Sequence, residues 1–216
     1  MARAISALLL LLLAACGGSS SEGTPTNPSP STTPVVVVLG DSLTAGPGLR
    51  SEEAYPALLQ DRARSAGLPH RIINAGVSGD TTADALRRLE GALSPDTRVL
   101  VVALGANDGL QGVPVDTVKQ NLRQIIERAR GRGIRILLCG MESFPTNGFD
   151  YVIRFHSVFP DLAGEYGLPL MPFLLDGVFG RAELNLPDGF HPNAAGMREI
   201  ASRMWPYLEP LLRATT

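Results

Sequence analysis

The sequence predicts an α/β domain, a parallel sheet with helices on both faces, and three observations lead to this. Short apolar runs recur along residues 35–216, helical patterns separate them, and polar glycine-rich turns follow several of them. Apolar runs without polar alternation are typical of strands that are covered on both faces. Strands that alternate with helices favour a parallel sheet, because each crossover connection then carries a helix.

Five apolar runs are predicted to be the strands of this sheet. They are residues 35–39 (VVVVL), 71–75 (RIINA), 98–104 (RVLVVAL), 134–139 (IRILLC) and 168–173 (LPLMPF). The fourth run ends in Cys139, which has no partner cysteine in the folded part of the chain. A single thiol in such a run is predicted to be a small buried core residue.

Residues typical of helix ends mark two helices between the first three strands. Pro56 suits the first turn of a helix that stops before Gly67. Thr81 and Asp84 have the spacing of a capping box, which predicts that a helix begins there and runs through Leu93.

Apolar residues at helical spacing predict three further helices over residues 115–129, 151–166 and 194–212. Proline lacks a backbone N–H and clashes with the preceding turn. We therefore expect Pro160 to bend the second of these helices, and Pro206 to kink the third or split it in two.

The first 34 residues have a different character from the rest of the chain. A positive start is followed by an apolar run too short to span a bilayer, which indicates a secretory signal peptide over residues 1–15. The run ends in LAAC, which resembles the lipobox of bacterial lipoproteins, in which the cysteine receives a lipid after cleavage. The interpretation is a lipid anchor on Cys16; a plain signal peptide with a chance cysteine is the alternative.

The segment that follows this cysteine consists almost entirely of Gly, Ser, Thr and Pro. Such a composition buries too little apolar surface to fold, so residues 16–34 are predicted to be a flexible tether. Residues 35–216 are long enough for one domain with its own core. The predicted protein crosses the inner membrane and stays anchored to a membrane, facing the periplasm or the cell exterior.

The composition and the missing motifs disfavour several classes of protein. A net charge of −2 without a basic field argues against nucleic-acid binding. Neither phosphate-binding glycine motif occurs, G-x-x-x-x-G-K-[ST] or G-x-G-x-x-G, so no nucleotide cofactor is expected. The three histidines are scattered along the sequence, so no metal site is expected either. The G-x-S-x-G elbow of the α/β-hydrolases is also missing.

Polar turns follow three of the predicted strands. They are residues 40–43 (GDSL), 76–81 (GVSGDT) and 105–109 (GANDG), and residues 188–192 (DGFHP) precede the last predicted helix. Ligands of open parallel sheets bind outside the carboxyl ends of the strands. We therefore expect these turns to meet in one site.

The residue types in these turns suit acyl transfer. Ser42 would be the nucleophile, which needs a base within hydrogen-bond reach, and His191 is the candidate base. Asp188 would orient the imidazole and stabilise its charged form. The candidate oxyanion donors are the amides of Ser42 and Gly79 and the side chain of Asn107.

Taken together, GDSLTAG at 40–46, SGDTT at 78–82, GAND at 105–108 and DGFHP at 188–192 resemble the SGNH, or GDSL, hydrolase superfamily. The resemblance implies a flavodoxin-like three-layer α/β/α sandwich with five parallel strands. It also implies the same catalytic and oxyanion residues as above. The fuller forms of these blocks resemble the bacterial thioesterase–lysophospholipase–arylesterase branch of the periplasm.

Other polar residues near these blocks are predicted to be structural. Asp41 is expected to accept hydrogen bonds from nearby backbone amides, and Asp108 to brace the turn that carries Asn107. His70 and His156 have no acid block beside them, so we expect them to be structural or solvated.

These inferences predict a serine esterase that acts on a small-molecule ester with a short or medium acyl or an aryl group. The alternatives are a lysophospholipase or acyl thioesterase acting on lipid, a carbohydrate O-acetylesterase, and a ligand-binding lipoprotein without catalysis. The loop 142–151 could line an acyl pocket, and Phe179 and residues 184–186 are lesser candidates for the same role.

Overall fold

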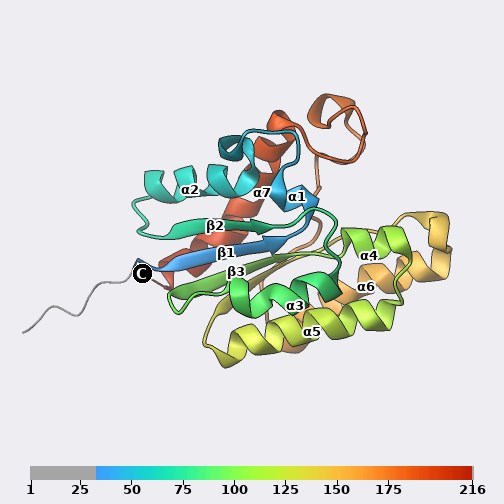
Figure 1. Ribbon diagram of the computed structural model, residues 1–216, viewed down its shortest axis with the longest axis horizontal. Coiled ribbons are helices and arrows are strands. Elements are labelled where there is room, and N and C mark those ends of the chain that lie inside the picture. Colours follow the sequence, from blue (N-terminus) through green and yellow to red (C-terminus); the bar gives the residue numbers. More distant parts are fainter. Residues whose placement is uncertain (1–32, 216) are drawn as a thin grey trace, which may run out of the picture. The chain divides into compact units, whose positions relative to one another are not determined.

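Five parallel strands form the central sheet, in the order β2-β1-β3-β4-β5 (Figure 1). The computed structural model describes residues 33–215, so the predicted signal peptide and Cys16 lie outside the described residues. The strands are β1 (Val35–Gly40), β2 (Arg71–Gly76), β3 (Thr97–Ala103), β4 (Arg135–Cys139) and β5 (Leu170–Met171). All pairings are parallel, which confirms the predicted α/β class.

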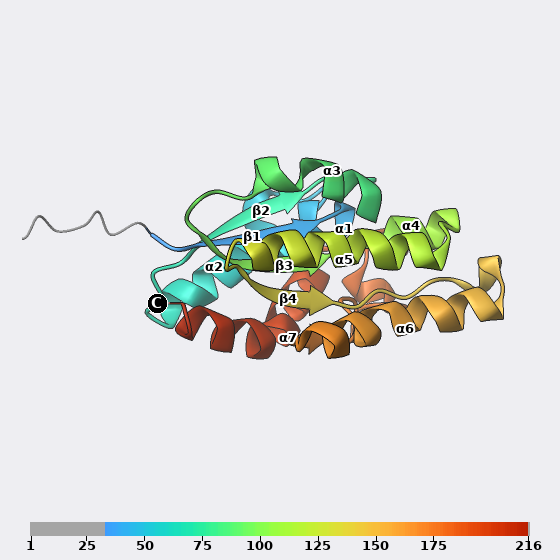
Figure 2. The ribbon, with the colours of Figure 1, turned by 90° about the horizontal axis from the view of Figure 1, so that it is seen from below.

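Helices cover both faces of this sheet and complete the three layers (Figures 1 and 2). The α-helices are α1 (Ser42–Ala45), α2 (Tyr55–Ser65), α3 (Thr82–Ala92), α4 (Ala106–Gln111), α5 (Val115–Gly131), α6 (Phe149–Tyr166) and α7 (Ala194–Arg213). Short 3₁₀ turns span Ser51–Glu53, Pro145–Asn147 and Ala182–Leu184. Helices α2 and α7 pack together on one face, and α3, α5 and α6 pack side by side on the other.

Strand β1 lies in the middle of the sheet and hydrogen-bonds to β2 on one side and β3 on the other. All six of its residues are buried, which explains why its sequence is apolar without alternation. The strand therefore delivers the turn that follows it to the middle of the sheet's carboxyl edge, where a site can form.

The predicted helix ends agree with the structure where capping residues mark them. Pro56 lies in the first turn of α2, and Gly67 follows the end of that helix with a positive φ of 69°. Thr81 and Asp84 form a reciprocal capping box at the start of α3. In that box, the Thr81 amide donates to the Asp84 carboxylate at 3.0 Å.

Two local expectations differ from the structure. The last strand, predicted over 168–173, contains only Leu170 and Met171. Helix α7 is not split, because it continues through Pro206 and Pro210. The buried face of α7 holds it against the core across the hydrogen bonds that the prolines remove.

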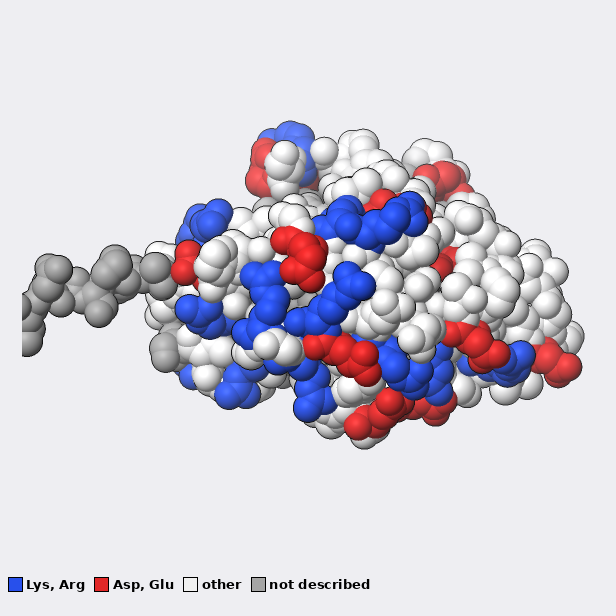
Figure 3. Space-filling view, turned by 60° about the horizontal axis from the view of Figure 1, so that its bottom comes forward, with Lys and Arg blue, Asp and Glu red and all other residues white. Residues whose placement is uncertain are grey.

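Charged side chains of both signs lie interspersed on the face that Figure 3 shows. Ion pairs link the neighbouring helices α5 and α6: Lys119 pairs with Asp161 at 2.7 Å and Arg123 with Glu165 at 2.9 Å. These pairs are exposed to solvent, so each contributes little to stability.

The two ends of the described chain lie at the amino edge of the sheet, opposite the polar turns (Figure 1). The chain enters β1 at Val35, and Thr215 near the other end hydrogen-bonds to His70 just before β2. Among residues 33–215, no helix combines the length and the apolar character that crossing a membrane requires.

Candidate active site

The turn between β1 and α1 places Ser42 at the carboxyl edge of the sheet. Asp41 caps α1, accepting a hydrogen bond from the Leu43 amide at 2.9 Å, and this fixes the turn around Ser42. A side chain at position 40 would collide with Thr44, so glycine is required before the turn.

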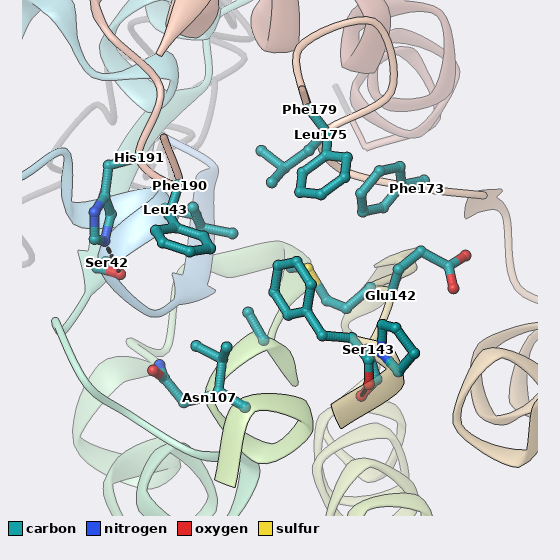
Figure 4. Close-up of a pocket in the computed structure, with 15 residues that line it drawn as sticks. Ser42, Leu43, Asn107, Glu142, Ser143, Phe173, Leu175, Phe179, Phe190 and His191 are labelled. Atoms are coloured by element: carbon teal, nitrogen blue, oxygen red, sulfur yellow. Dashed lines mark hydrogen bonds between the residues drawn. The ribbon is translucent and has the colours of Figure 1, made fainter. Parts of the chain in front are cut away.

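The structure brings Ser42, His191 and Asp188 into one hydrogen-bonded chain (Figure 4 shows the first two). His191 Nε2 lies 2.9 Å from Ser42 Oγ, and His191 Nδ1 lies 2.8 Å from Asp188 Oδ2. An ionised carboxylate only accepts, so Nδ1 carries a proton and donates it to Asp188. Nε2 is then the acceptor for the Ser42 hydroxyl, which is the orientation that proton removal from serine needs.

Backbone amides hold the carboxylate of Asp188 in place. The amides of His191 and Phe190 both donate to Asp188 Oδ1 at 2.9 Å. The amide and then the imidazole of His191 lower the pKa of Asp188 to about 2. Asp188 is therefore ionised throughout the neutral range, as a group that stabilises an imidazolium must be.

The two remaining candidate donors lie in the segments that follow the neighbouring strands β2 and β3. Asn107, in the first turn of α4, uses one N–H of its side-chain amide to bind the Asp80 carbonyl at 2.9 Å. Gly79 is exposed, its φ is +87°, and no atom lies within 4 Å of where a Cβ would stand. With no side chain at this position, the backbone can come close to a substrate.

Two buried carboxyl groups lie behind the site. Asp41 is fully buried, burial raises its pKa to about 7, and no group of residues 33–215 hydrogen-bonds to its Oδ2. Burial also raises the pKa of Asp108, which accepts from the Thr82 amide at 2.8 Å and the Thr82 hydroxyl at 2.6 Å. Asp41 thus accepts a hydrogen bond from a backbone amide, as predicted. Asp108 lies in α4, and its carboxylate binds Thr82 at the start of α3.

A cavity of about 420 Å³ opens beside Ser42 and His191. Its walls are mainly apolar, and its far wall carries Glu142 and Ser143 (Figure 4). The aromatic lining residues are Phe144, Phe173, Phe179 and Phe190. Phe144 contacts two of them, with ring centroids 5.9 Å from Phe179 and 5.8 Å from Phe190.

The loop 142–151 contributes only its first part to this cavity. Phe149 and Tyr151 do not line it, and neither do residues 184–186, whereas Phe179 does. Sequence reasoning missed Phe173 and Phe190, as well as the lining residues Leu110, Met141 and Leu175. Phe190 stands between Asp188 and His191 in the DGFHP block, and that position could have indicated it.

The other candidate nucleophile and bases do not line the cavity. Cys139 is fully buried, and burial raises the pKa of its thiol. His70 is buried, and its ring bonds to Thr215 at 3.0 Å. The exposed ring of His156 bonds to Glu142 at 2.7 Å. Within residues 33–215, no group of three or more His, Cys, Asp or Glu side chains is arranged to hold a metal ion.

A hydroxyl, an imidazole and a carboxylate in one chain at the carboxyl edge of a parallel α/β sandwich define a serine hydrolase. Residues 38–199 match the model of the GDSL-like Lipase/Acylhydrolase family. The chain therefore belongs to this family, and the resemblance found in its four sequence blocks is confirmed.

Similar proteins support the same assignment. Esterase TesA of Pseudomonas aeruginosa is 38% identical over 178 residues, which cover 82% of this chain and 89% of that protein. Thioesterase 1/protease 1/lysophospholipase L1 of Escherichia coli K12 is 35% identical over 178 residues, with coverages of 82% and 84%. The crystal structure of TesA matches with a TM-score of 0.78 at 36% identity, over 82% of this chain and 99% of that one. This chain is a GDSL-type serine ester hydrolase of the branch that the sequence predicted.

Proposed function

We propose that Ser42 is the nucleophile of this ester hydrolase, that His191 is its general base and that Asp188 orients the imidazole. The unbroken hydrogen-bond chain from Ser42 Oγ through His191 to Asp188 carries this proposal. Ser42 Oγ attacks the ester carbonyl while its proton passes to His191 Nε2. The proton then passes to the leaving alcohol, and the acyl group stays on Ser42.

The second half of the reaction uses the same groups. His191 takes a proton from a water molecule, which attacks the acyl-enzyme, and then returns that proton to Ser42 Oγ as the acid leaves. In both halves, the negative charge on the carbonyl oxygen is stabilised by the amides of Ser42 and Gly79 and the free N–H of Asn107.

The substrate class follows from the walls of the cavity. Four phenylalanines surround the space beside Ser42, and the lining offers few hydrogen-bonding groups. A sugar ester needs polar partners for its hydroxyl groups, whereas an acyl chain or an aromatic ring needs apolar surface. We therefore propose esters with short to medium acyl chains, or aryl esters, rather than O-acetylated carbohydrates.

Hydrolysis of p-nitrophenyl acetate, butyrate, octanoate and palmitate by the wild-type protein and the Ser42→Ala variant tests this function. We expect the wild type to prefer the shorter and medium chains and the variant to be inactive. Activity that survives in the Ser42→Ala variant would exclude Ser42 as the nucleophile. Faster turnover of acetylated xylan than of any p-nitrophenyl ester would exclude the proposed substrate class.

A lysophospholipase or thioesterase activity is the second candidate. The apolar rim of the cavity favours it, because Leu110, Phe179 and Phe190 are each at least 50% exposed and could meet a longer acyl chain. The name of the Escherichia coli relative includes both activities. Activity that keeps rising beyond acyl chains of a dozen carbons would support this candidate.

We further propose that residues 1–15 are a signal peptide, that Cys16 carries a lipid and that residues 16–34 tether a hydrolase domain over 35–216. The order of apolar run, small residues, cysteine and Gly/Ser/Pro-rich segment supports this proposal. It places the enzyme on a membrane, facing the periplasm or the cell exterior. The Cys16→Ser variant should lose its membrane fractionation and keep its activity; unchanged fractionation would contradict the anchor.

A further inference from the structure

The side chain of Arg88 extends from α3 to the end of β1 and to the loop after β2. Its Nε donates to Asp80 Oδ2 at 2.6 Å, and its Nη2 donates to the Gly40 carbonyl at 3.0 Å. The ion pair between Arg88 and Asp80 is partly buried: the Arg88 side chain is 27% exposed to solvent and that of Asp80 is 11% exposed. This guanidinium plays no part in the proton transfers described above.

One end of this contact fixes the turn that displays Ser42. The Gly40 carbonyl also accepts the Val77 amide at 3.1 Å, so it binds the loop after β2 as well as Arg88. Gly40 lies two residues before Ser42, whose amide is one of the proposed oxyanion donors. Movement of this carbonyl would therefore move the nucleophile and its amide together.

The other end fixes the loop that carries Gly79. Asp80 directly follows Gly79, and its own carbonyl accepts the side-chain amide of Asn107 at 2.9 Å. Asp80 thus binds Arg88 through its carboxylate and Asn107 through its carbonyl. The three proposed oxyanion donors come from three separate segments, the start of α1, the loop after β2 and the first turn of α4, and all three connect to the Gly40–Arg88–Asp80 bridge.

We propose that Arg88 is a positioning residue that holds the three oxyanion donors at a fixed spacing, an inference that rests on the proposed roles of Ser42, Gly79 and Asn107. Oxyanion stabilisation depends on donors placed 2.7–3.1 Å from the developing charge. The planar guanidinium reaches two acceptors in different directions at once, whereas the single ammonium of lysine is a point charge. Arg88 therefore supplies a fixed distance between its two acceptors, which a positive charge alone would not.

The variants Arg88→Lys and Arg88→Met test this role in the full-length chain. Kinetics with p-nitrophenyl butyrate should show kcat lowered by about 10²-fold in both variants and KM changed little, as for a displaced catalytic group. A trifluoromethyl ketone that adds to Ser42 places an oxyanion among the same donors. Its affinity should fall by the same factor as kcat/KM, which loss of stability alone would not produce.

A double-mutant cycle with Asp80→Ala tests whether the bridge acts as a unit. The double variant Asp80→Ala/Arg88→Met should lose no more activity than Arg88→Met, because either change breaks the same bridge. Arg87→Gln is the matched control on the same helix: Arg87 is exposed and pairs only with Asp84 in the described structure, so kcat should stay within twofold of wild type.

Thermal unfolding and circular dichroism show which variants are folded. A folded Arg88→Met variant with wild-type kcat and ketone affinity would overturn the proposal. Full activity in Arg88→Lys would also overturn it, because lysine keeps the positive charge but lacks the planar group that binds two acceptors at once. If Ser42→Ala is inactive while both Arg88 variants remain fully active, only this inference fails. If Ser42→Ala is active, the proposed function fails instead.

Discussion

Asp41 should make the free energy of unfolding of this protein fall as the pH rises from about 4 to about 7. Its side chain is fully buried next to Ser42, and burial raises its pKa from 3.8 to about 7. The folded protein therefore binds this proton more tightly than the unfolded chain does, so the stabilisation is complete below pH 3.8 and is lost as pH rises to 7. Each pKa unit is worth about 1.4 kcal/mol, which gives a total of about 4 kcal/mol.

The Asp41→Asn variant isolates this contribution. Asparagine has nearly the same shape, keeps an oxygen that accepts the Leu43 amide and does not titrate. Urea unfolding from pH 4 to pH 8, followed by the fluorescence of Trp205, gives the free energy of unfolding of both proteins. Subtracting one free energy from the other removes the contributions that the two proteins share.

The wild type should lose about 4 kcal/mol relative to Asp41→Asn between pH 4 and pH 8. Asp188 should behave with the opposite sign, because its folded pKa is lowered to about 2 and its stabilisation is lost as pH falls. The reasoning for Asp41 would be refuted if the free energy of unfolding of the wild type, relative to that of Asp41→Asn, stayed constant or rose as the pH increases.

Three further predictions concern the site itself. Asn107→Ala should lower kcat by about 10²–10³ with little change in KM or melting temperature, measured with p-nitrophenyl butyrate; unchanged turnover would remove Asn107 from the oxyanion site. Asp188→Asn should lower kcat by up to about 10⁴-fold at pH 7, because the amide no longer stabilises the correct tautomer of His191, and a loss below threefold would contradict that role. Phe144→Ala should raise the ratio of octanoate to butyrate hydrolysis, because Phe144 packs between Phe179 and Phe190 in the cavity wall; an unchanged ratio would place the acyl chain elsewhere.

Much of the fold could be predicted because the central strands have a strong local pattern. The apolar run of β1 needs no tertiary information to be recognised, and neither does the capping box of Thr81 and Asp84. The site was predictable for a related reason: Ser42 and His191 are 149 residues apart in sequence, yet each lies in a short block next to a strand end or a helix start. Parallel topology brings such blocks to one edge.

The parts that could not be predicted depend on packing rather than on pattern. Strand β5 contains two residues because Pro169 and Pro172 flank it, and proline cannot donate to a sheet. Helix α4 is six residues long and contains Gly109, so it has no apolar period to detect. The cavity wall combines aromatic residues from loops far apart in sequence, such as Phe144 and Phe173, and only the folded chain shows that they meet.

The most direct test of the central claim is to map the covalent adduct of a fluorophosphonate probe by peptide mass spectrometry. Such a probe reacts with a serine that a neighbouring base activates. We expect one adduct per chain, on Ser42, and none in the His191→Ala variant. An adduct on another serine, or a Ser42 that stays unmodified while ester hydrolysis continues, would contradict the account.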